Sequence, residues 1–376
     1  MKVLYIGHYK EFGGWGRAAT DQILALDRAG VDVVCRNITL TTDKPNLEPR
    51  LIELESKSIE GCDVCIQHIL PHHLVGTKSF RKNIAFLEAE TYSIKPLAWF
   101  EQLKQMDEVW VANEDLKNSL DRDGVGVPVT VVHHATDIEK YQKRYNPLNI
   151  RGLENSFKFY YAGDINDRKN LESIAACFHS EFDKSEDVAL IMKVKKFGHN
   201  PQQTQSVLDS AMQEVKKRIR IYDDLSEYKR EIVISDEVSE EDMMSIHQFC
   251  DCFVCPTHGE AWSIPSLDAM AFGNTPICSN FGGPKEFIAG EDTGKLIDGV
   301  FSVCQCSDSA FPDMFTGREY WFQPCEKQIR EQMRSYYEDF KKNPIAYKVR
   351  TRAAGMDNVK RFSYEKIGQR MLEVLS

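Results

Sequence analysis

The sequence predicts an α/β protein made of two doubly wound domains. Three observations lead to this prediction. The chain has 376 residues, which is long for one domain and sufficient for two, each with its own core. Short β-rich runs alternate with helical patterns, which favours parallel sheets covered by helices on both faces. The alternation lapses once, near residue 150, and then restarts.

The first domain is expected to span residues 1–150. It opens with a strand over residues 3–6, followed by a helix over 18–29 in which Ala, Ile and Leu recur at helical spacing. Gly30 ends this helix, because glycine is the preferred residue just beyond a helix C-terminus. Further predicted strands are 31–35, 64–67, 84–87, 109–112 and 129–133.

Residues 145–156 are polar and broken by proline and glycine, so we interpret them as a linker. The second domain is expected over 151–355. Its predicted strands are 157–161, 189–194, 232–234, 252–255 and 275–278, and its predicted helices are 171–178 and 265–272. Within the C-terminal segment, 356–376, residues 364–375 predict an amphipathic helix that can pack back on the first domain. The stretch 300–323 is the least regular and is expected to be a surface loop.

Composition narrows the functional classes. The net charge is −10 and there is no basic tail, which argues against a nucleic-acid partner. No apolar run is long enough to cross a bilayer or to form a signal-peptide core, so a cytoplasmic location is expected, with a peripheral membrane contact left open. The sequence does not indicate an oligomeric state.

The eleven cysteines do not form a convincing metal or disulfide pattern. Cys62 and Cys65 have redox or zinc spacing, yet no second pair or histidine pair follows at zinc-site distance. Cys65 and Cys255 both fall inside apolar strand-like runs. We therefore expect reduced thiols that act as small buried hydrophobic residues.

A glycine-rich loop follows the first predicted strand. Gly14, Gly16 and Ala19 give a formal G-x-G-x-x-A match, which is typical of NAD or FAD sites. The match begins too far beyond the strand, and the second strand ends in Arg36-Asn37 without an acidic residue. The preferred interpretation is that Gly13 and Gly14 let the backbone approach an anion at a helix N-terminus.

A basic pair follows the first strand of the second domain. Arg168 and Lys169 lie between the strand 157–161 and a helix that begins near Leu171. Ligands of open α/β sheets bind beyond the carboxyl ends of the strands, so this pair is placed to hold a pyrophosphate. Arginine can bind it in a bidentate manner, and lysine adds a compact charge. The alternative is a solvated loop pair beside Asp164 and Asp167.

An acidic strand-to-helix segment is the most informative part of the chain. Glu260 lies in a loop after the strand 252–255, and Asp268 lies near the start of the helix that Pro265 opens. Ser263 is expected to cap this helix, and the amides of residues 263–266, including Ile264, are expected to be free for a phosphate. Two carboxylates beside such an anion site suit a nucleotide sugar, because carboxylates accept hydrogen bonds from vicinal hydroxyl groups.

Together these motifs resemble the retaining GT-B glycosyltransferases of family 4, also called glycosyl transferases group 1. The segments that carry the resemblance are Gly13-Gly14, the Val-Val-His-His-Ala-Thr-Asp run over 131–137, Gly163 with Lys169-Asn170, the Glu260-to-Asp268 segment that resembles E-x7-E, and Gly282-Gly283 with Glu286. The family pattern has glutamate at Asp268, arginine at Asp164 and glycine at Ala135, so this chain departs from it at three positions.

The resemblance implies two Rossmann-like domains that face each other across a cleft. It implies a hexosyltransferase that takes a UDP-, GDP- or ADP-sugar as donor and a glycan as acceptor, with retention and without a metal or cofactor. The implied catalytic residues are Glu260, Lys169, Arg168 and Glu88, and the implied donor-binding residues are Gly13, Gly14, Gly163, Ser263, Ile264, Asp268 and Glu286. Glu88 stands where the family commonly has a histidine, and His68 is a rival for that role.

Three alternatives remain open from the sequence. The departures at Asp164 and Asp268 are compatible with a nucleotide-sugar-binding protein that has no catalytic activity. A phosphorylase or hydrolase can be built on the same architecture. The glycine loop leaves an NAD(P)-dependent oxidoreductase as a less favoured interpretation.

Overall fold

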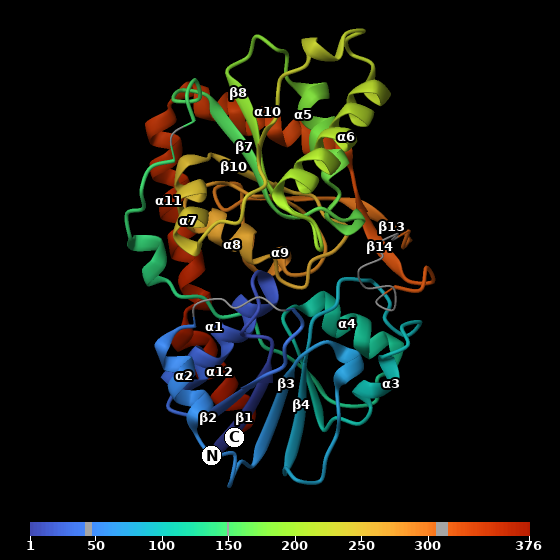
Figure 1. The fold of residues 1–376 in the computed structure, drawn as a ribbon, viewed down its shortest axis with the longest axis vertical. Coiled ribbons are helices and arrows are strands. Elements are labelled where there is room, and N and C mark those ends of the chain that lie inside the picture. Colours follow the sequence, from blue (N-terminus) through green and yellow to red (C-terminus); the bar gives the residue numbers. More distant parts are fainter. Residues whose placement is uncertain (42–46, 149, 306–314) are drawn as a thin grey trace. The chain divides into compact units, whose positions relative to one another are not determined.

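The computed structural model describes residues 1–41, 47–148, 150–305 and 315–376, and it forms two compact α/β units (Figure 1). Unit 1 contains Met1–Lys140 and Lys360–Ser376, together with a short stretch that ends at Glu319. Unit 2 contains the other described residues between Tyr141 and Val359. Unit 1 is therefore built from both ends of the sequence and from one short stretch that interrupts unit 2.

Unit 1 is built on a six-stranded parallel sheet with the strand order β2-β1-β3-β4-β5-β6. The strands are β1 (Lys2–Gly7), β2 (Asp32–Asn37), β3 (Val64–His68), β4 (Lys82–Leu87), β5 (Glu108–Val111) and β6 (Val129–Val131). The helices are α1 (Gly14–Arg28), α2 (Pro49–Ser56), α3 (Phe100–Leu103), α4 (Glu114–Asp123) and α12 (Tyr364–Leu375). The strands read as apolar runs because helices cover them.

The first helix begins earlier than the sequence predicts, since α1 starts at Gly14 and includes part of the glycine loop. Gly13 precedes it with φ 93°, a conformation that side chains disfavour. A Cβ on Gly16 would lie 1.8 Å from the carbonyl oxygen of Glu11. The glycines therefore allow the loop to fold tightly onto the start of the helix.

Unit 2 is built on a second six-stranded parallel sheet with the order β12-β11-β10-β7-β8-β9. Its strands are β7 (Phe157–Asp164), β8 (Val188–Lys195), β9 (Ile232–Ile234), β10 (Cys252–Cys255), β11 (Ile277–Ser279) and β12 (Lys295–Ile297). Its helices are α5 (Leu171–Glu181), α6 (Pro201–Ile219), α7 (Glu240–Phe249), α8 (Ile264–Ala271), α9 (Pro284–Phe287), α10 (Glu326–Lys342) and α11 (Pro344–Val359). The prediction of an α/β fold with two parallel sheets is confirmed.

Strand order identifies where each sheet can bind a ligand. In unit 2 the order reverses between β7 and β10, and in unit 1 it reverses between β1 and β3. Open α/β sheets bind ligands outside the carboxyl ends of the strands at such a reversal, because the adjacent loops diverge there. The two reversal points are therefore the first places to look for a site.

The segment 300–323 is not wholly irregular, and the prediction of a loop is wrong for its two ends. β13 (Gly299–Val303) and β14 (Tyr320–Pro324) pair in an antiparallel hairpin. Phe301 and Phe322 are cross-strand partners with ring centroids 5.6 Å apart. Such aromatic pairs stabilise two adjacent strands. Residues 306–314 of the predicted loop and residue 149 of the predicted linker lie outside the described residues.

The last helix belongs to unit 1, where α12 packs along α1 (Figure 1). The hydroxyl of Tyr364 donates a hydrogen bond to Asp21 of α1. A Cβ on Gly368 would lie 2.1 Å from the carbonyl oxygen of Ala25, so the two helices approach closely at this glycine. Among the helices that the structure describes, none is long and apolar enough to cross a membrane.

The cysteines in the described part of the chain are free, and all of them except Cys325 are buried. Burial raises the pKa of Cys65 to about 12 and that of Cys255 to about 11. A thiol with a raised pKa is a poor nucleophile. The expectation of reduced, buried cysteines is confirmed for Cys65 and Cys255.

Candidate functional site

Two loops of unit 2 are joined at the reversal point of its sheet. The loop after β7 forms a short 3-10 helix, Asp167–Lys169, which the Asn166 side chain caps by accepting a hydrogen bond from the Lys169 amide. The loop after β10 docks on it. The Asn170 side chain donates to the carbonyl of Pro256, and the His258 amide donates to the carbonyl of Arg168. The basic pair predicted from the sequence is therefore held on a rigid base.

Glu260 lies between the two basic side chains. Its Oε1 atom accepts a hydrogen bond from Lys169 Nζ at 2.6 Å and lies 3.3 Å from the guanidinium of Arg168. Arg168 also donates to the carbonyl of Gly259 at 2.6 Å. Three residues from two distant parts of the sequence thus form one cluster, and the cluster keeps a net positive charge because two cations face one carboxylate.

The surroundings of Glu260 favour its ionised form. Burial of the side chain acts to raise its pKa, but the charges of Lys169 and Arg168 outweigh burial, so that the pKa lies below its usual value. The side chains of Lys169 and Arg168 are only 17% and 18% exposed. Partly buried charges are screened weakly by water, so this cluster can exert a strong field on an anion.

The start of α8 lies in the same loop, but it differs from the sequence prediction. Ser263 occupies the N-cap position with φ 75°, and its hydroxyl pairs with the Ser266 hydroxyl at 2.7 Å instead of capping a backbone amide. The amides of Ser266 and Leu267 both donate to the Ser263 carbonyl, and Pro265 has no N–H. Within the part of the chain that the structure describes, the Ile264 amide is the first-turn donor of α8 with no hydrogen bond.

The backbone of Ser263 is locally strained, because its φ of 75° lies in the left-handed region. Only three non-glycine residues in the described part of the chain have a positive φ, and Ser263 is buried. Residues held in such conformations cluster at functional sites, where the surrounding structure compensates for their cost. The backbone here is bent so that α8 starts beside the loop of Glu260.

Gly282 and Gly283 pack against the backbone of the loop that carries Glu260. A Cβ on Gly282 would lie 2.2 Å from the carbonyl oxygen of Glu260, and one on Gly283 would lie 2.2 Å from the Cα of Trp262. The Gly283 amide donates to the Glu260 carbonyl at 2.9 Å. The two glycines therefore act through close backbone packing. Glu286 follows them on α9 and is half-buried.

Asp268 is buried on α8, and its Oδ1 atom accepts a hydrogen bond from the hydroxyl of Tyr141. Tyr141 is the first residue of unit 2. Its ring packs against Phe272 with the centroids 6.0 Å apart. The Asp268 carboxylate therefore fixes the chain where it enters unit 2.

The remaining predicted donor-binding residues lie at the carboxyl ends of strands or just beyond them. Gly163 falls within β7, because that strand continues to Asp164 in register with β8. A Cβ on Gly163 would lie 2.4 Å from the hydroxyl oxygen of Tyr161, so glycine is required there by packing. Gly13 and Gly14 belong to unit 1, in the loop after β1 and the first turn of α1.

A second polar cluster lies at the carboxyl ends of the unit 1 strands. Glu88 follows β4, and its Oε1 atom accepts hydrogen bonds from His68 Nε2 at 3.1 Å and from His134 Nε2 at 2.6 Å. His68 ends β3, and its Nδ1 atom accepts a hydrogen bond from the Tyr5 hydroxyl at 2.7 Å. The two rivals from the sequence, Glu88 and His68, are therefore partners in one network.

The hydrogen bonds of this cluster are consistent with an ionised glutamate and a neutral His68. Burial acts to raise the pKa of Glu88, but His134 and His68 lower it to about 2. Burial lowers the pKa of His68. An ionised carboxylate cannot donate, so the proton of His68 belongs on Nε2, which leaves Nδ1 to accept from Tyr5.

The same cluster is where the described residues could hold a metal ion. One ligand atom each from His68, Glu88 and His134 lies within 4.8 Å of the others. Two imidazoles and a carboxylate are ligands that zinc and iron accept. The direct hydrogen bonds already use these atoms, so the contacts of the cluster are accounted for without an ion. The expected absence of a metal stays a prediction.

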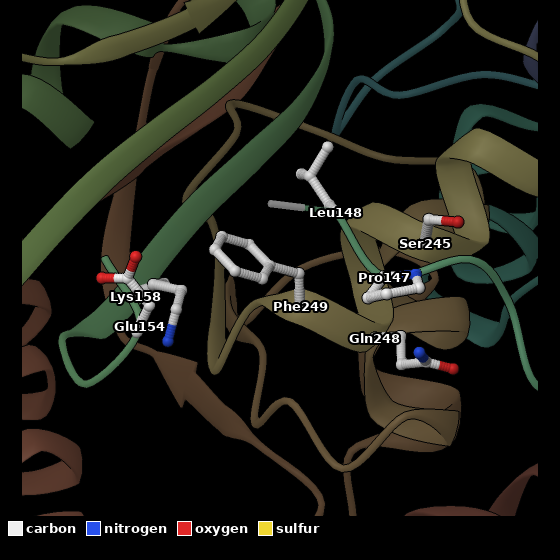
Figure 2. Close-up of a pocket in the computed structure, with 7 residues that line it drawn as sticks. All are labelled: Pro147, Leu148, Glu154, Lys158, Ser245, Gln248 and Phe249. Atoms are coloured by element: carbon white, nitrogen blue, oxygen red, sulfur yellow. The ribbon is translucent and has the colours of Figure 1, made fainter. Parts of the chain in front are cut away.

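The surface hollow of Figure 2 lies elsewhere in unit 2. Its lining residues are Pro147, Leu148, Glu154, Lys158, Ser245, Gln248 and Phe249. Lys158 is buried there. Its ammonium donates a hydrogen bond to the Ser156 carbonyl and forms an ion pair with Asp251 at 3.2 Å. None of the predicted site residues lines this hollow.

Several residues of the unit 2 site were not singled out from the sequence. His258 stacks on Trp321 with ring centroids 4.2 Å apart, and its Nδ1 atom hydrogen-bonds the Phe322 carbonyl. The hairpin strand β14 thereby contacts the loop that carries Glu260. No local pattern could reveal this pairing, because the partners are far apart in sequence. Asn166 could have been noticed, because asparagine three residues before Lys169 is a helix-cap signal.

Sequence comparison agrees with the position of this site. Residues 150–305 match the model of the family described as Glycosyl transferases group 1. This match includes Arg168, Lys169, Glu260 and Asp268, and it leaves unit 1 outside it. No curated protein matches the chain by sequence.

Solved structures extend the likeness to the whole fold. Sucrose-phosphate synthase from Thermosynechococcus elongatus superposes with a TM-score of 0.65 at 15% identity, over 100% of this chain and 98% of that chain. HepE from Anabaena, in complex with UDP-glucose, gives 0.63 at 13% identity over 100% and 99%. A trehalose-6-phosphate structure from E. coli, bound with UDP-2-fluoro glucose, gives 0.64 at 10% identity over 100% and 99%. The predicted two-domain α/β fold of the GT-B type is confirmed.

Proposed function

We propose that this protein is a retaining hexosyltransferase that moves a sugar from a nucleoside diphosphate donor to a glycan acceptor without a metal. The family match over residues 150–305 supports glycosyl transfer, and two similar structures hold UDP-sugars. Unit 2 would bind the donor and unit 1 the acceptor. The cytoplasmic location and the identity of the donor base remain predictions.

The observation that carries the proposal is the Lys169–Glu260–Arg168 cluster at the sheet reversal of unit 2. A diphosphate needs cations and backbone amides at the carboxyl ends of parallel strands, and this site offers both. Glu260 holds the two cations in place before the donor arrives. The Ile264 amide supplies a further donor at the start of α8.

In the proposed reaction an acceptor hydroxyl oxygen bonds to the anomeric carbon of the sugar, and the bond between that carbon and the β-phosphate oxygen breaks. Negative charge builds up on the leaving diphosphate, which takes up the proton of the acceptor hydroxyl. Lys169 and Arg168 stabilise that charge in a partly buried site, where such interactions are strong. The ionised Glu260 is suited to accept hydrogen bonds from sugar hydroxyl groups, which would orient the donor. Glu88 of unit 1, held ionised by its histidine partners, is proposed to face the transferred sugar.

Substitution of the cluster tests this proposal. Lys169→Ala and Glu260→Ala are each expected to lower transfer by about a hundredfold or more, because each removes a preorganised charge. Release of nucleoside diphosphate from UDP-, GDP- and ADP-glucose with an oligosaccharide acceptor would be measured. Lys184 and Glu227 form an exposed pair at 2.9 Å in the same unit, so Lys184→Ala and Glu227→Ala are matched controls and should retain activity.

Full activity in either cluster variant would overturn the assignment of the site. A wild-type protein that binds a donor but never releases nucleoside diphosphate would instead support the alternative of a nucleotide-sugar-binding protein. Circular dichroism of each variant would confirm that the fold is retained.

A further inference from the structure

Lys193 is a buried cation that the proposed reaction does not use. It lies on β8 and is only 9% exposed. Among the described residues it forms no hydrogen bond and no ion pair. Lysine is rarely buried without a partner, because the removal of its charge from water costs free energy. Lys193 is therefore a largely buried lysine with room for a ligand as its hydrogen-bond partner.

The strand register shows where Lys193 lies. It pairs with Ala162 of β7 on one side and Ile234 of β9 on the other, two residues before β8 ends. Side chains alternate along a strand, so Lys193 shares its face with Lys195 and, across the register, with Asp164. Lys193 therefore lies on one face of the sheet, near the carboxyl ends of β7, β8 and β9.

The nearby charges do not neutralise Lys193 through direct contact. Asp164 has its Oδ1 atom 3.8 Å from Lys195 Nζ, so this carboxylate is engaged by the neighbouring lysine. Asp236 and Glu237, in the loop after β9, are exposed and act on Lys193 only at a distance. Burial and the charge of Lys195 lower the pKa of Lys193, while the charges of Asp164, Glu237 and Asp236 oppose this shift.

The strand order of unit 2 indicates which part of a donor would lie near Lys193. The sheet order reverses between β7 and β10, where the phosphate cluster is located, and β8 is the second strand of the first half of this sheet. In doubly wound nucleotide-binding sheets the phosphates lie at the reversal, and the end of that second strand contacts the nucleoside. A donor whose diphosphate contacts Lys169 would therefore extend its nucleoside over β8.

We propose that Lys193 is a specificity residue for the donor, whose ammonium donates a hydrogen bond to an oxygen of the nucleoside. This inference rests on the proposed function and deepens it. An oxygen-bearing group there completes the hydrogen bonding of a cation that the protein leaves unpaired. The same reasoning predicts that the free protein tolerates a neutral side chain of similar length at this position.

The test compares the wild type with Lys193→Met, Lys193→Arg and the control Lys184→Met by calorimetry with UDP, GDP, ADP and inorganic pyrophosphate. Lys193→Met should bind the preferred nucleoside diphosphate at least tenfold more weakly and pyrophosphate as the wild type does. It should also unfold at the same or a higher temperature without ligand, because methionine buries the same stem without a partly desolvated charge. Lys193→Arg should recover part of the affinity, and the control should change nothing.

Each other outcome is decisive. Nucleotide affinity within twofold of the wild type would overturn the role of Lys193 while leaving the proposed function intact. An equal loss for pyrophosphate would move the contact to a phosphate and overturn the assignment to the nucleoside. A lower unfolding temperature of ligand-free Lys193→Met, with unchanged affinity, would make the lysine structural. A wild type that binds no nucleotide would overturn the proposed function together with this inference.

Discussion

At the scale of single residues, each candidate site contains a carboxylate that is held ionised although it is buried. Glu260 depends on two cationic side chains, whereas Glu88 depends on hydrogen bonds to two imidazoles. The first arrangement suits an anionic ligand, since a positive charge remains. The second holds the carboxylate within a buried hydrogen-bond network.

The Glu88 cluster leads to a prediction about acid stability. Its pKa of about 2 in the folded protein lies below the ordinary 4.5, so its contribution to folding is complete above about pH 4.5 and is lost as the pH falls toward 2. At 1.36 kcal/mol per pKa unit the full contribution is about 3 kcal/mol. The free-energy difference between the wild type and Glu88→Gln, from urea unfolding, should therefore shrink between pH 6 and pH 3.

Glu227→Gln is the control for this measurement, because Glu227 is exposed and its removal should give a small difference that is nearly independent of pH. A difference for Glu88→Gln that stayed constant down to pH 3 would contradict the ionised, hydrogen-bonded state assigned to Glu88.

At the scale of elements, the site depends on how closely two loops and a helix start can approach. Gly282 and Gly283 pack against the backbone of the Glu260 loop, and Ser263 bends the chain into α8. Interactions of this kind fix the position of a carboxylate without touching it. Small displacements matter, because hydrogen bonds weaken steeply when their geometry is disturbed.

Gly283→Ala tests this close approach. The added Cβ would meet the Trp262 backbone at 2.2 Å, so the Glu260 loop must shift. We expect transfer to fall by at least tenfold, and stability to fall by about 1–3 kcal/mol, as for other overpacked positions. Gly290→Ala is a matched control on the same stretch of chain, since nothing lies within 4 Å of its Cβ position. Equal activity of the two variants would show that the loop position is not critical.

At the scale of the whole molecule, the chain enters unit 2 after Lys140 and returns to unit 1 after Val359, and α12 is part of unit 1. α12 covers α1, which carries the glycine loop at its start. The stability of unit 1 therefore depends on residues that lie far along the sequence from its strands.

Gly368→Ala tests this arrangement. A Cβ at this position would lie 2.1 Å from the Ala25 carbonyl oxygen, so α12 must move away from α1. Hydrogen exchange should increase in α1 and α12, while the amides of α8 in unit 2 keep their protection. Nucleotide binding by unit 2 should be unchanged. Uniform loss of protection across both units would contradict a local effect.

Much of the fold could be predicted from the sequence, because apolar strand runs and helix boundaries are local signals. The strands 64–67 and 84–87 lie within β3 and β4, and 232–234 coincides with β9. Boundaries failed where tertiary contacts extend an element. β7 runs on to Asp164 because β8 pairs with it there, and α1 begins at Gly14 because the glycine loop packs onto the chain before it.

The sequence alone determined the two-sheet α/β class and the residue types of the unit 2 site, since strand patterns, Arg168-Lys169 and Glu260 are all readable along the chain. Only the tertiary structure decided their partners. It paired Glu260 with Lys169, engaged Asp268 with Tyr141, joined His68 to Glu88, and left Lys193 buried without a counter-ion. The physical reason is that strand order, which no local pattern encodes, decides which distant loops meet at a sheet edge.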